Sequence, residues 1–123
     1  MMLVRHHEHL RICVLRVKPT VLDIDGTVVS DSNASSAYVS FRAAPGGVRI
    51  VDKDMTFADD WRDSDKIQFW RKQAAKCAEV LVPDDVPPKY IFGAYVSCEE
   101  ARKTFDGYKT GLTATINAKM FFQ

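Results

Sequence analysis

The chain has 123 residues, of which 46% are hydrophobic and 27% charged, with 17 lysines and arginines against 16 aspartates and glutamates. This composition is ordinary for a globular protein with one core, and no apolar run is long enough to cross a membrane. A formal net charge of +1 neither requires nor excludes nucleic acid, because a local basic stripe can bind it. We predict one domain, residues 1–123, with no membrane partner.

The start of the chain and its cysteines indicate a cytoplasmic protein. Met1-Met2-Leu3 is not followed by the long apolar segment of a signal peptide. Cys13, Cys77 and Cys98 are odd in number and widely spaced, which favours reduced thiols over a disulfide framework. We therefore expect a cytoplasmic location. No metal site is predicted, because no second acidic or cysteine ligand accompanies the histidines near the start of the chain.

The first part of the chain is predicted to form a β-meander. Residues 10–17 and 20–24 are rich in β-branched side chains, which favour strands. Asp25-Gly26 is a turn signal, and residues 27–29 can return as a third strand.

A hairpin and a helix are predicted next. Residues 35–41 and 48–51 flank the turn-forming residues 43–47, which predicts a second pair of strands. A helix is expected over residues 65–76, with Ser64 or Asp63 as its N-cap.

The second half of the chain is predicted to alternate strands with helices. We expect a strand over 77–82 that Pro83 ends, a helical turn within 86–92, a strand over 93–96, a helix over 98–108 capped by Ser97, and a final strand over 113–122.

Glu79 is the most informative residue of the chain. It lies in the apolar run 77–82, which we predict to be a short buried strand. An acidic side chain inside such a strand is costly unless it is paired or takes part in chemistry. The alternatives are that Glu79 lies on the exposed face of an edge strand, or that it pairs with Lys76.

The segment Val21-Leu22-Asp23-Ile24-Asp25-Gly26-Thr27 resembles the opening motif of haloacid-dehalogenase-type phosphatases. In that family the first aspartate attacks phosphorus and the second is an acid and base. The same chemistry needs a strand-borne lysine, an acidic pair for magnesium, and several βα units around a parallel sheet. Few such units are predicted here. A simple hairpin turn at Asp25-Gly26 is favoured, and a magnesium-dependent phosphatase that uses Asp23 and Asp25 is a less favoured alternative.

Aromatic and basic residues gather around the predicted helix at 65–76. Trp61 and Trp70 could stack on bases, while Arg62, Arg71 and Lys72 could contact phosphate. The alternative is that these residues are packed, as aromatic side chains beside arginines more often are.

Several segments of the chain form an ordered series: Ser30-Asp31-Ser32-Asn33-Ala34-Ser35, Phe41, Asp59-Asp60-Trp61, residues 71–82, Val86-Pro87-Pro88 and Tyr90-Ile91. This series resembles the DarT family of DNA ADP-ribosyltransferase toxins over about residues 10–122. In that family a Thr-Asp-x-Asn-Ala segment precedes a strand, and an Arg-Arg-Gln-Ala-Glu-Phe-Leu-Val strand carries the catalytic glutamate. By position, the resemblance matches Asp31, Asn33 and Ala34 to the first segment, Glu79 to the catalytic glutamate and Phe121-Phe122 to an aromatic ending.

The resemblance implies an α+β fold with a mixed β-core and flanking helices. It implies NAD-dependent ADP-ribosylation of a base in single-stranded DNA, with NAD as co-substrate and Glu79 as the catalytic residue. It also implies a toxin of a toxin–antitoxin pair, with a macrodomain antitoxin as a possible partner. The nucleic acid would be bound by Trp61, Arg62, Arg71, Lys72 and Lys76, while Asp31, Asn33 and Ala34 would form a structural motif.

The chain departs from the family pattern at three points. Lys76-Cys77 stands where the family has Arg-Gln before Ala-Glu, which removes a guanidinium and an amide. Ser30 replaces the usual threonine. The early segment of the family, whose histidine and arginine grip NAD, is expected to be missing ahead of Met1-Met2-Leu3. The alternative to an active toxin is therefore an inactive or split nucleic-acid-binding fragment of the same fold.

Overall fold

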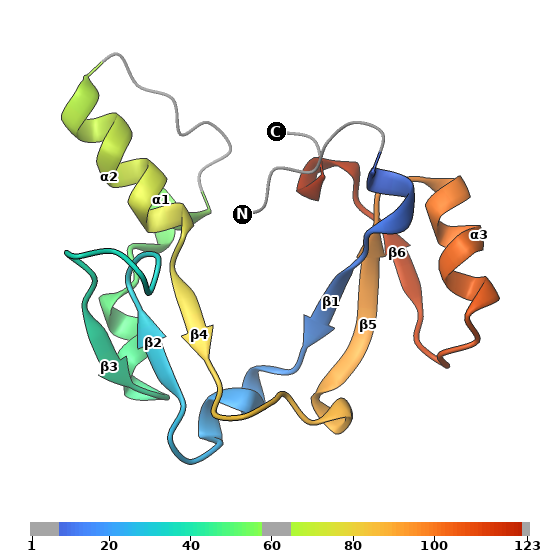
Figure 1. The fold of residues 1–123 in the computed structure, drawn as a ribbon, viewed down its shortest axis with the longest axis horizontal. Coiled ribbons are helices and arrows are strands. Elements are labelled where there is room, and N and C mark those ends of the chain that lie inside the picture. Colours follow the sequence, from blue (N-terminus) through green and yellow to red (C-terminus); the bar gives the residue numbers. More distant parts are fainter. Residues whose placement is uncertain (1–7, 58–64, 122–123) are drawn as a thin grey trace. The chain divides into compact units, whose positions relative to one another are not determined.

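The computed structural model describes residues 8–57 and 65–121. Contacts divide the chain into two compact units: unit 1 spans residues 20–86, and unit 2 combines residues 8–19 with residues 87–121. In the described residues each unit holds one three-stranded sheet together with short helices, so the fold is α+β, as predicted (Figure 1). That residues 1–123 form a single domain stays a prediction.

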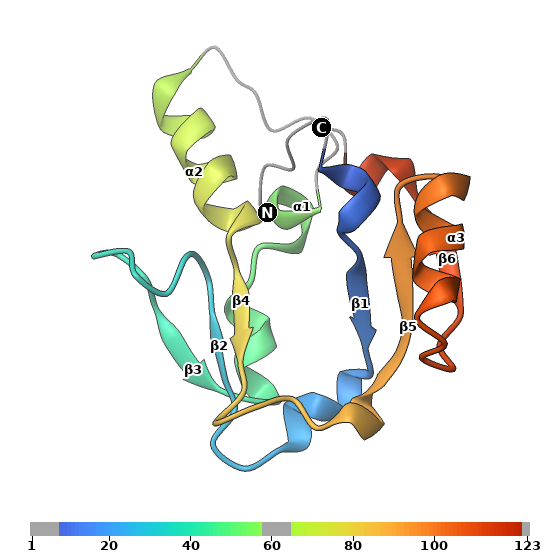
Figure 2. The ribbon, with the colours of Figure 1, turned by 45° about the vertical axis from the view of Figure 1, so that its right-hand side comes forward.

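Unit 1 is built on three antiparallel strands in the order β3-β2-β4. The central strand β2 (Val28–Ser30) pairs with β3 (Phe41–Ala43) on one side and β4 (Glu79–Leu81) on the other, as Figures 1 and 2 show. Val29 is 1% exposed at the centre of β2, where a β-branched side chain packs well. β4 lies at an edge of this sheet, and Glu79 and Val80 are exposed on it. The strand predicted over residues 77–82 is thus present as β4, but the prediction that it is buried was wrong, and the alternative of an exposed edge strand is observed.

The predicted meander is wrong at its second strand, because the 3-10 helix η2 (Pro19–Asp23) replaces it. Pro19 has no N–H for a sheet ladder, and its fixed φ suits the first position of a helix. The turn at Asp25-Gly26 is confirmed, since Gly26 adopts a φ of +84° that glycine tolerates best. After this turn β2 pairs with β3 and β4 and not with residues 20–24.

The predicted hairpin around residues 43–47 is also wrong. Residues 31–40 form a loop, and the second predicted strand is the 3-10 helix η3 (Gly46–Ile50). A Cβ on Gly47 would lie 2.7 Å from the Arg42 carbonyl oxygen. Glycine therefore allows η3 to fold back closely onto β3, whose ladder hydrogen bonds are made with β2.

The predicted helix over residues 65–76 is confirmed as α2 (Lys66–Lys76). Its N-cap is Asp65, whose carboxylate accepts from the Ile67 N–H at 2.8 Å and the Gln68 N–H at 3.2 Å. The predicted caps Ser64 and Asp63 lie outside the described residues. A short helix that was not predicted, α1 (Lys53–Thr56), precedes α2 and is too brief to show helical periodicity. The Thr56 hydroxyl donates to the Ala75 carbonyl at 3.0 Å and joins the two helices.

Unit 2 is a sheet in the order β1-β5-β6 with one helix across it. β1 (Val14–Val17) pairs antiparallel with β5 (Ile91–Val96), and β5 pairs parallel with β6 (Ala114–Ile116). The crossover between the parallel strands is α3 (Glu99–Gly107), as such a connection requires. Its apolar side packs on the sheet and forms the buried core of Ala94, Val96, Ala101, Phe105 and Ala114.

The predicted elements of unit 2 are largely present, with different ends. The first predicted strand begins as the 3-10 helix η1 (His9–Arg11), and the predicted helical turn is η4 (Pro88–Tyr90). Cys98, and not Ser97, is the N-cap of α3. The last strand ends at Ile116 and is followed by η5 (Ala118–Met120). Within the described ranges, no helix is both long and apolar enough to span a membrane.

The packing of α3 on its sheet gives a test of unit 2. Phe105 is 8% exposed and Tyr108 is 75% exposed. We expect Phe105→Ala to lower the free energy of unfolding by about 3–5 kcal/mol because it leaves a cavity. The matched Tyr108→Ala should change it by less than about 0.5 kcal/mol. Urea unfolding followed by circular dichroism measures both, and equal effects would contradict the packing.

The start of α3 makes the Cys98 thiol more acidic. A hydrogen bond from the Ala101 backbone lowers the pKa of this thiol most, and one from the Ser97 side chain lowers it further. A lowered pKa places more thiolate at neutral pH, and the thiolate is the form that is alkylated. In a Cys13→Ser, Cys77→Ser variant, the rate of iodoacetamide labelling against pH should have its midpoint at a lower pH than the midpoint of a cysteine in an unstructured peptide. An equal or higher midpoint would contradict this hydrogen bonding.

Candidate active site

Glu79 is the first residue of β4, three residues after the end of α2. In the sheet it pairs with Ser30, the last residue of β2. The loop of residues 31–40 leaves the sheet at this point. The fold therefore places Glu79 beside the segment that contains Asp31, Asn33 and Ala34, the residues that resemble the Thr-Asp-x-Asn-Ala segment of the family pattern.

One oxygen of the Glu79 carboxylate is held by this loop. Oε2 accepts from the backbone N–H of Ala34 at 3.1 Å, across 45 residues of sequence. Among the described residues, no donor reaches Oε1 and no ion pair joins Glu79 to Lys76, so the suggested pairing of these two is not observed. The side chain is exposed, which leaves the second oxygen accessible to a substrate.

Asp31 and Asn33 shape the loop that presents Ala34. Asp31 Oδ1 accepts from the Ser40 N–H at 2.8 Å, and the Asp31 N–H donates to the Ser40 carbonyl at 3.2 Å, so the two ends of the loop are closed. Asn33 Oδ1 accepts from the Ser35 N–H at 2.9 Å in a local Asx turn. Both side chains use their oxygen atoms on the loop backbone, which agrees with a structural motif.

Ser30 completes the junction between the loop and β4, and sequence reasoning did not mark it as a site residue. Its hydroxyl is fully buried and lies 2.7 Å from the Ser32 carbonyl oxygen. The Oγ atom of Ser30 also accepts a hydrogen bond from the Glu79 backbone N–H at 3.2 Å. The pattern that could have revealed it is a small hydroxyl residue ending a β-branched run just ahead of Asp31.

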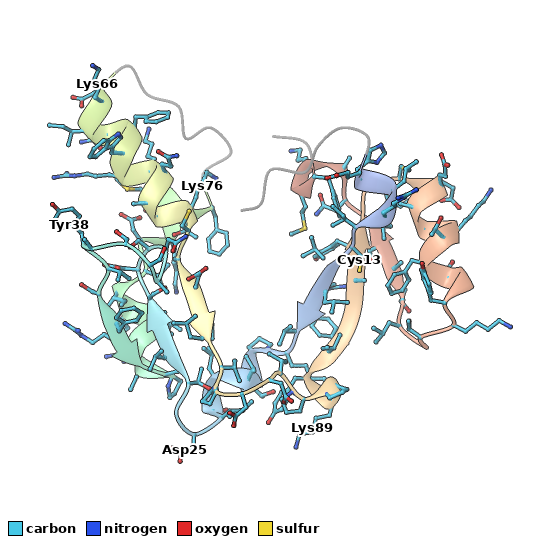
Figure 3. All side chains as sticks on the ribbon, in the orientation of Figure 1. Cys13, Asp25, Tyr38, Lys66, Lys76 and Lys89 are labelled. Atoms are coloured by element: carbon cyan, nitrogen blue, oxygen red, sulfur yellow. The ribbon has the colours of Figure 1, made fainter. Side chains whose placement is uncertain are left out.

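Asp23 and Asp25 do not share this site. Asp23 ends η2 and Asp25 lies in the turn before β2, whereas the Ala34 loop follows β2. Figure 3 shows Asp25 and Tyr38, which belongs to the loop, beyond opposite ends of β2. The sheet beside the two aspartates is antiparallel, so the parallel βα units that the phosphatase alternative requires are not present in the described part of unit 1.

The predicted nucleic-acid residues on α2 differ in their exposure. Arg71 is exposed and lines an open depression together with Lys66, Ile67 and Trp70. Lys72 and Lys76 are half-buried, and with 3.6 residues per turn they are neighbours of each other on the helix. Figure 3 shows Lys66 and Lys76 at opposite ends of α2. Trp61 and Arg62 lie outside the described residues.

Trp70 is the main feature of the exposed face of α2. Its side chain is 73% exposed, and Ile67 beside it is 65% exposed. Lys66 was not singled out from the sequence, although its spacing of four residues from Trp70 places both on one side of a helix. This face therefore combines one aromatic ring with two cations.

The fold of two small sheets and helices has a counterpart among solved structures. It superposes on a solved structure, Thermosipho africanus DarTG in complex with ADP-ribose, with a TM-score of 0.76 and 21% sequence identity. The superposition covers 94% of this chain and 30% of that chain, so this chain spans about a third of its length. At this identity the likeness shows the fold alone.

The sequence model of one family, described as ssDNA thymidine ADP-ribosyltransferase, DarT, matches residues 1–122. The chain therefore belongs to the DarT family, and the predicted resemblance is confirmed. No curated protein matches the chain. The predicted absence of an NAD-binding segment stays a prediction, because the family match begins at residue 1.

Proposed function

We propose that the chain carries the catalytic glutamate of an NAD-dependent enzyme that ADP-ribosylates a thymidine base in single-stranded DNA. The family match supports this reaction. The observation that carries the proposal is the hydrogen bond between the Ala34 N–H and Glu79 Oε2. It joins the two segments that the sequence resemblance matched to the family pattern, and no described donor binds Oε1 of this exposed residue.

Glu79 has two tasks in this proposal. Its carboxylate accepts a hydrogen bond from a ribose hydroxyl of NAD and stabilises the positive charge that develops on the ribose as nicotinamide leaves. The bond from ribose C1′ to a base nitrogen forms, and Glu79 takes the proton that this nitrogen releases, provided that it lies within about 3 Å. The exposed Oε1 atom fits both tasks, because the loop already holds Oε2.

The exposed face of α2 is proposed to bind the DNA strand. Trp70 offers a ring on which a base can stack, and Lys66 and Arg71 beside it can contact phosphates. Trp61, Arg62, Lys72 and Lys76 belong to the same proposal through the sequence pattern. A base must be unstacked before it can be modified, which favours a single strand.

The proposal includes a cellular setting that follows from the family. The chain would be the toxin of a toxin–antitoxin pair in the cytoplasm, and a macrodomain antitoxin would remove the ADP-ribose.

Removal of the Glu79 charge tests the proposed catalytic role. Glu79→Gln keeps an oxygen that can accept from Ala34 but removes the base and the negative charge. We expect transfer of ADP-ribose to a thymidine-containing oligonucleotide to fall by at least about 100-fold, without unfolding. Mass spectrometry of the oligonucleotide after incubation with NAD measures the adduct.

Asp23→Asn is the matched control for this variant, because Asp23 is an exposed carboxylate of the same unit. Its transfer activity should equal that of the unchanged chain. Transfer that survives Glu79→Gln would disprove the role of Glu79, and loss of transfer in folded Asp23→Asn would return attention to the phosphatase motif. No adduct from the unchanged chain, with binding of the oligonucleotide retained, would favour the nucleic-acid-binding fragment.

The DNA surface on α2 is tested by binding without NAD. Trp70→Ala should weaken binding of a short thymidine oligonucleotide by about 5- to 100-fold, because one stacked base is lost. Arg71→Gln should reduce the slope of log K against log salt by about 0.7. Fluorescence anisotropy measures both, with Tyr108→Ala as the control for an exposed aromatic side chain. Equal affinity of Trp70→Ala and Tyr108→Ala would exclude this face.

A further inference from the structure

The Ser30 hydroxyl makes two hydrogen bonds at the junction of β2, β4 and the loop. Ser30 is 0% exposed, and a buried hydroxyl without partners would cost free energy. The hydroxyl has one proton, and the Ser32 carbonyl at 2.7 Å is a closer acceptor than the Glu79 carbonyl at 3.5 Å. The proton therefore points to Ser32, and the lone pairs of Oγ accept the Glu79 N–H at 3.2 Å.

These two bonds fix both partners of the Ala34–Glu79 contact. The bond to the Glu79 N–H sets the backbone from which the carboxylate extends. The bond to the Ser32 carbonyl sets the path of the chain two residues before Ala34, whose N–H meets that carboxylate. The buried Oγ atom of Ser30 thus contacts both the backbone that carries the Glu79 side chain and the segment that carries its donor, the Ala34 N–H.

We propose that Ser30 is a positioning residue for Glu79 and that its hydroxyl keeps the Glu79 carboxylate on the Ala34 N–H. Its effect on the reaction rests on the proposed catalytic role of Glu79. Its effect on geometry does not, so the two can be tested apart. Ser30 itself is covered and makes no contact with substrate.

Thr27 provides a matched control for the loss of a buried hydroxyl. It is 2% exposed, immediately precedes β2, and its Oγ1 donates to the Val21 carbonyl at 3.5 Å, away from Glu79. Thr27→Val and Ser30→Ala each remove one buried hydroxyl from the same region. A purely structural role for Ser30 predicts similar behaviour of the two variants, whereas a positioning role does not.

The geometric test is the amide proton of Ala34 in ¹H–¹⁵N NMR spectra of the full chain. A charged acceptor strengthens a hydrogen bond, so loss of the carboxylate in Glu79→Ala should shift this proton upfield. We expect Ser30→Ala to shift it in the same direction although the carboxylate is present, and Ser30→Thr to leave it near its original position. The Glu79 amide should also exchange with solvent at least about tenfold faster in Ser30→Ala, because its acceptor is gone.

The proposal would be overturned if the chemical shift of the Ala34 amide proton in Ser30→Ala equalled its shift in Thr27→Val and in the unchanged chain.

The activity test uses NAD and the thymidine oligonucleotide. Ser30→Ala should lower kcat by about 10- to 100-fold with KM for the oligonucleotide unchanged, Ser30→Thr should restore it, and Thr27→Val should retain it. Equal losses in Ser30→Ala and Thr27→Val would overturn the positioning role. An unchanged chain without activity would count against the proposed function, while the NMR result would still decide the geometry.

Discussion

The pairing of Ser30 with Glu79 at the end of the β2–β4 ladder is the constraint on which the candidate site depends. It brings the start of an edge strand to the point where the loop of residues 31–40 leaves the sheet. An exposed carboxylate at this point costs little, because water solvates it, and one backbone N–H is enough to orient it. A glutamate deeper in the sheet would need a full set of partners and would be closed to a substrate.

The sequence allowed the two longer helices and several strands to be predicted, and the catalytic role of Glu79 stays a prediction. α2 and α3 were predicted because each has a periodic pattern and a capping region at its start. In unit 1 the strands β2 and β4 were predicted, over residues 27–29 and 77–82, whereas β3 was misplaced at residues 35–41, because a strand of three residues leaves almost no periodic signal. Glu79 was found because an acidic residue in an apolar run conflicts with the local pattern, and such conflicts concentrate at functional sites. Its burial was wrongly predicted, because edge and central strands have similar sequences.

The exposure of the basic residues on α2 and the hydrogen bonds of Ser30 were not predicted, because both depend on contacts between segments that are distant in sequence. Which side of α2 is covered depends on α1, a four-residue helix that leaves no periodic signal. Lys72 and Lys76 were therefore grouped with Arg71 from composition, although they are half-buried and Arg71 is exposed. Ser30 was noted only as a replacement for the usual threonine, because the sequence does not show which segments its hydroxyl joins. Only the three-dimensional contacts show that its hydroxyl links two segments.

The Asp25-Gly26 turn lies next to the same sheet and contacts the segment that follows β4. A slip of one residue in the pairing of β4 would turn Glu79 to the opposite face and place Val80 beside the loop. Three residue pairs alone specify that register weakly, so contacts at the two ends of the β2–β4 ladder are also relevant to it. At one end the Ser30 hydroxyl binds the Glu79 N–H, and at the other Gly26 packs so closely on Pro83 that a Cβ would lie 3.0 Å from its Cγ. The glycine of the phosphatase-like motif therefore allows the turn before β2 to lie close to Pro83, two residues beyond the end of β4. Backbone conformation and close packing thus account for a glycine at this position of the motif.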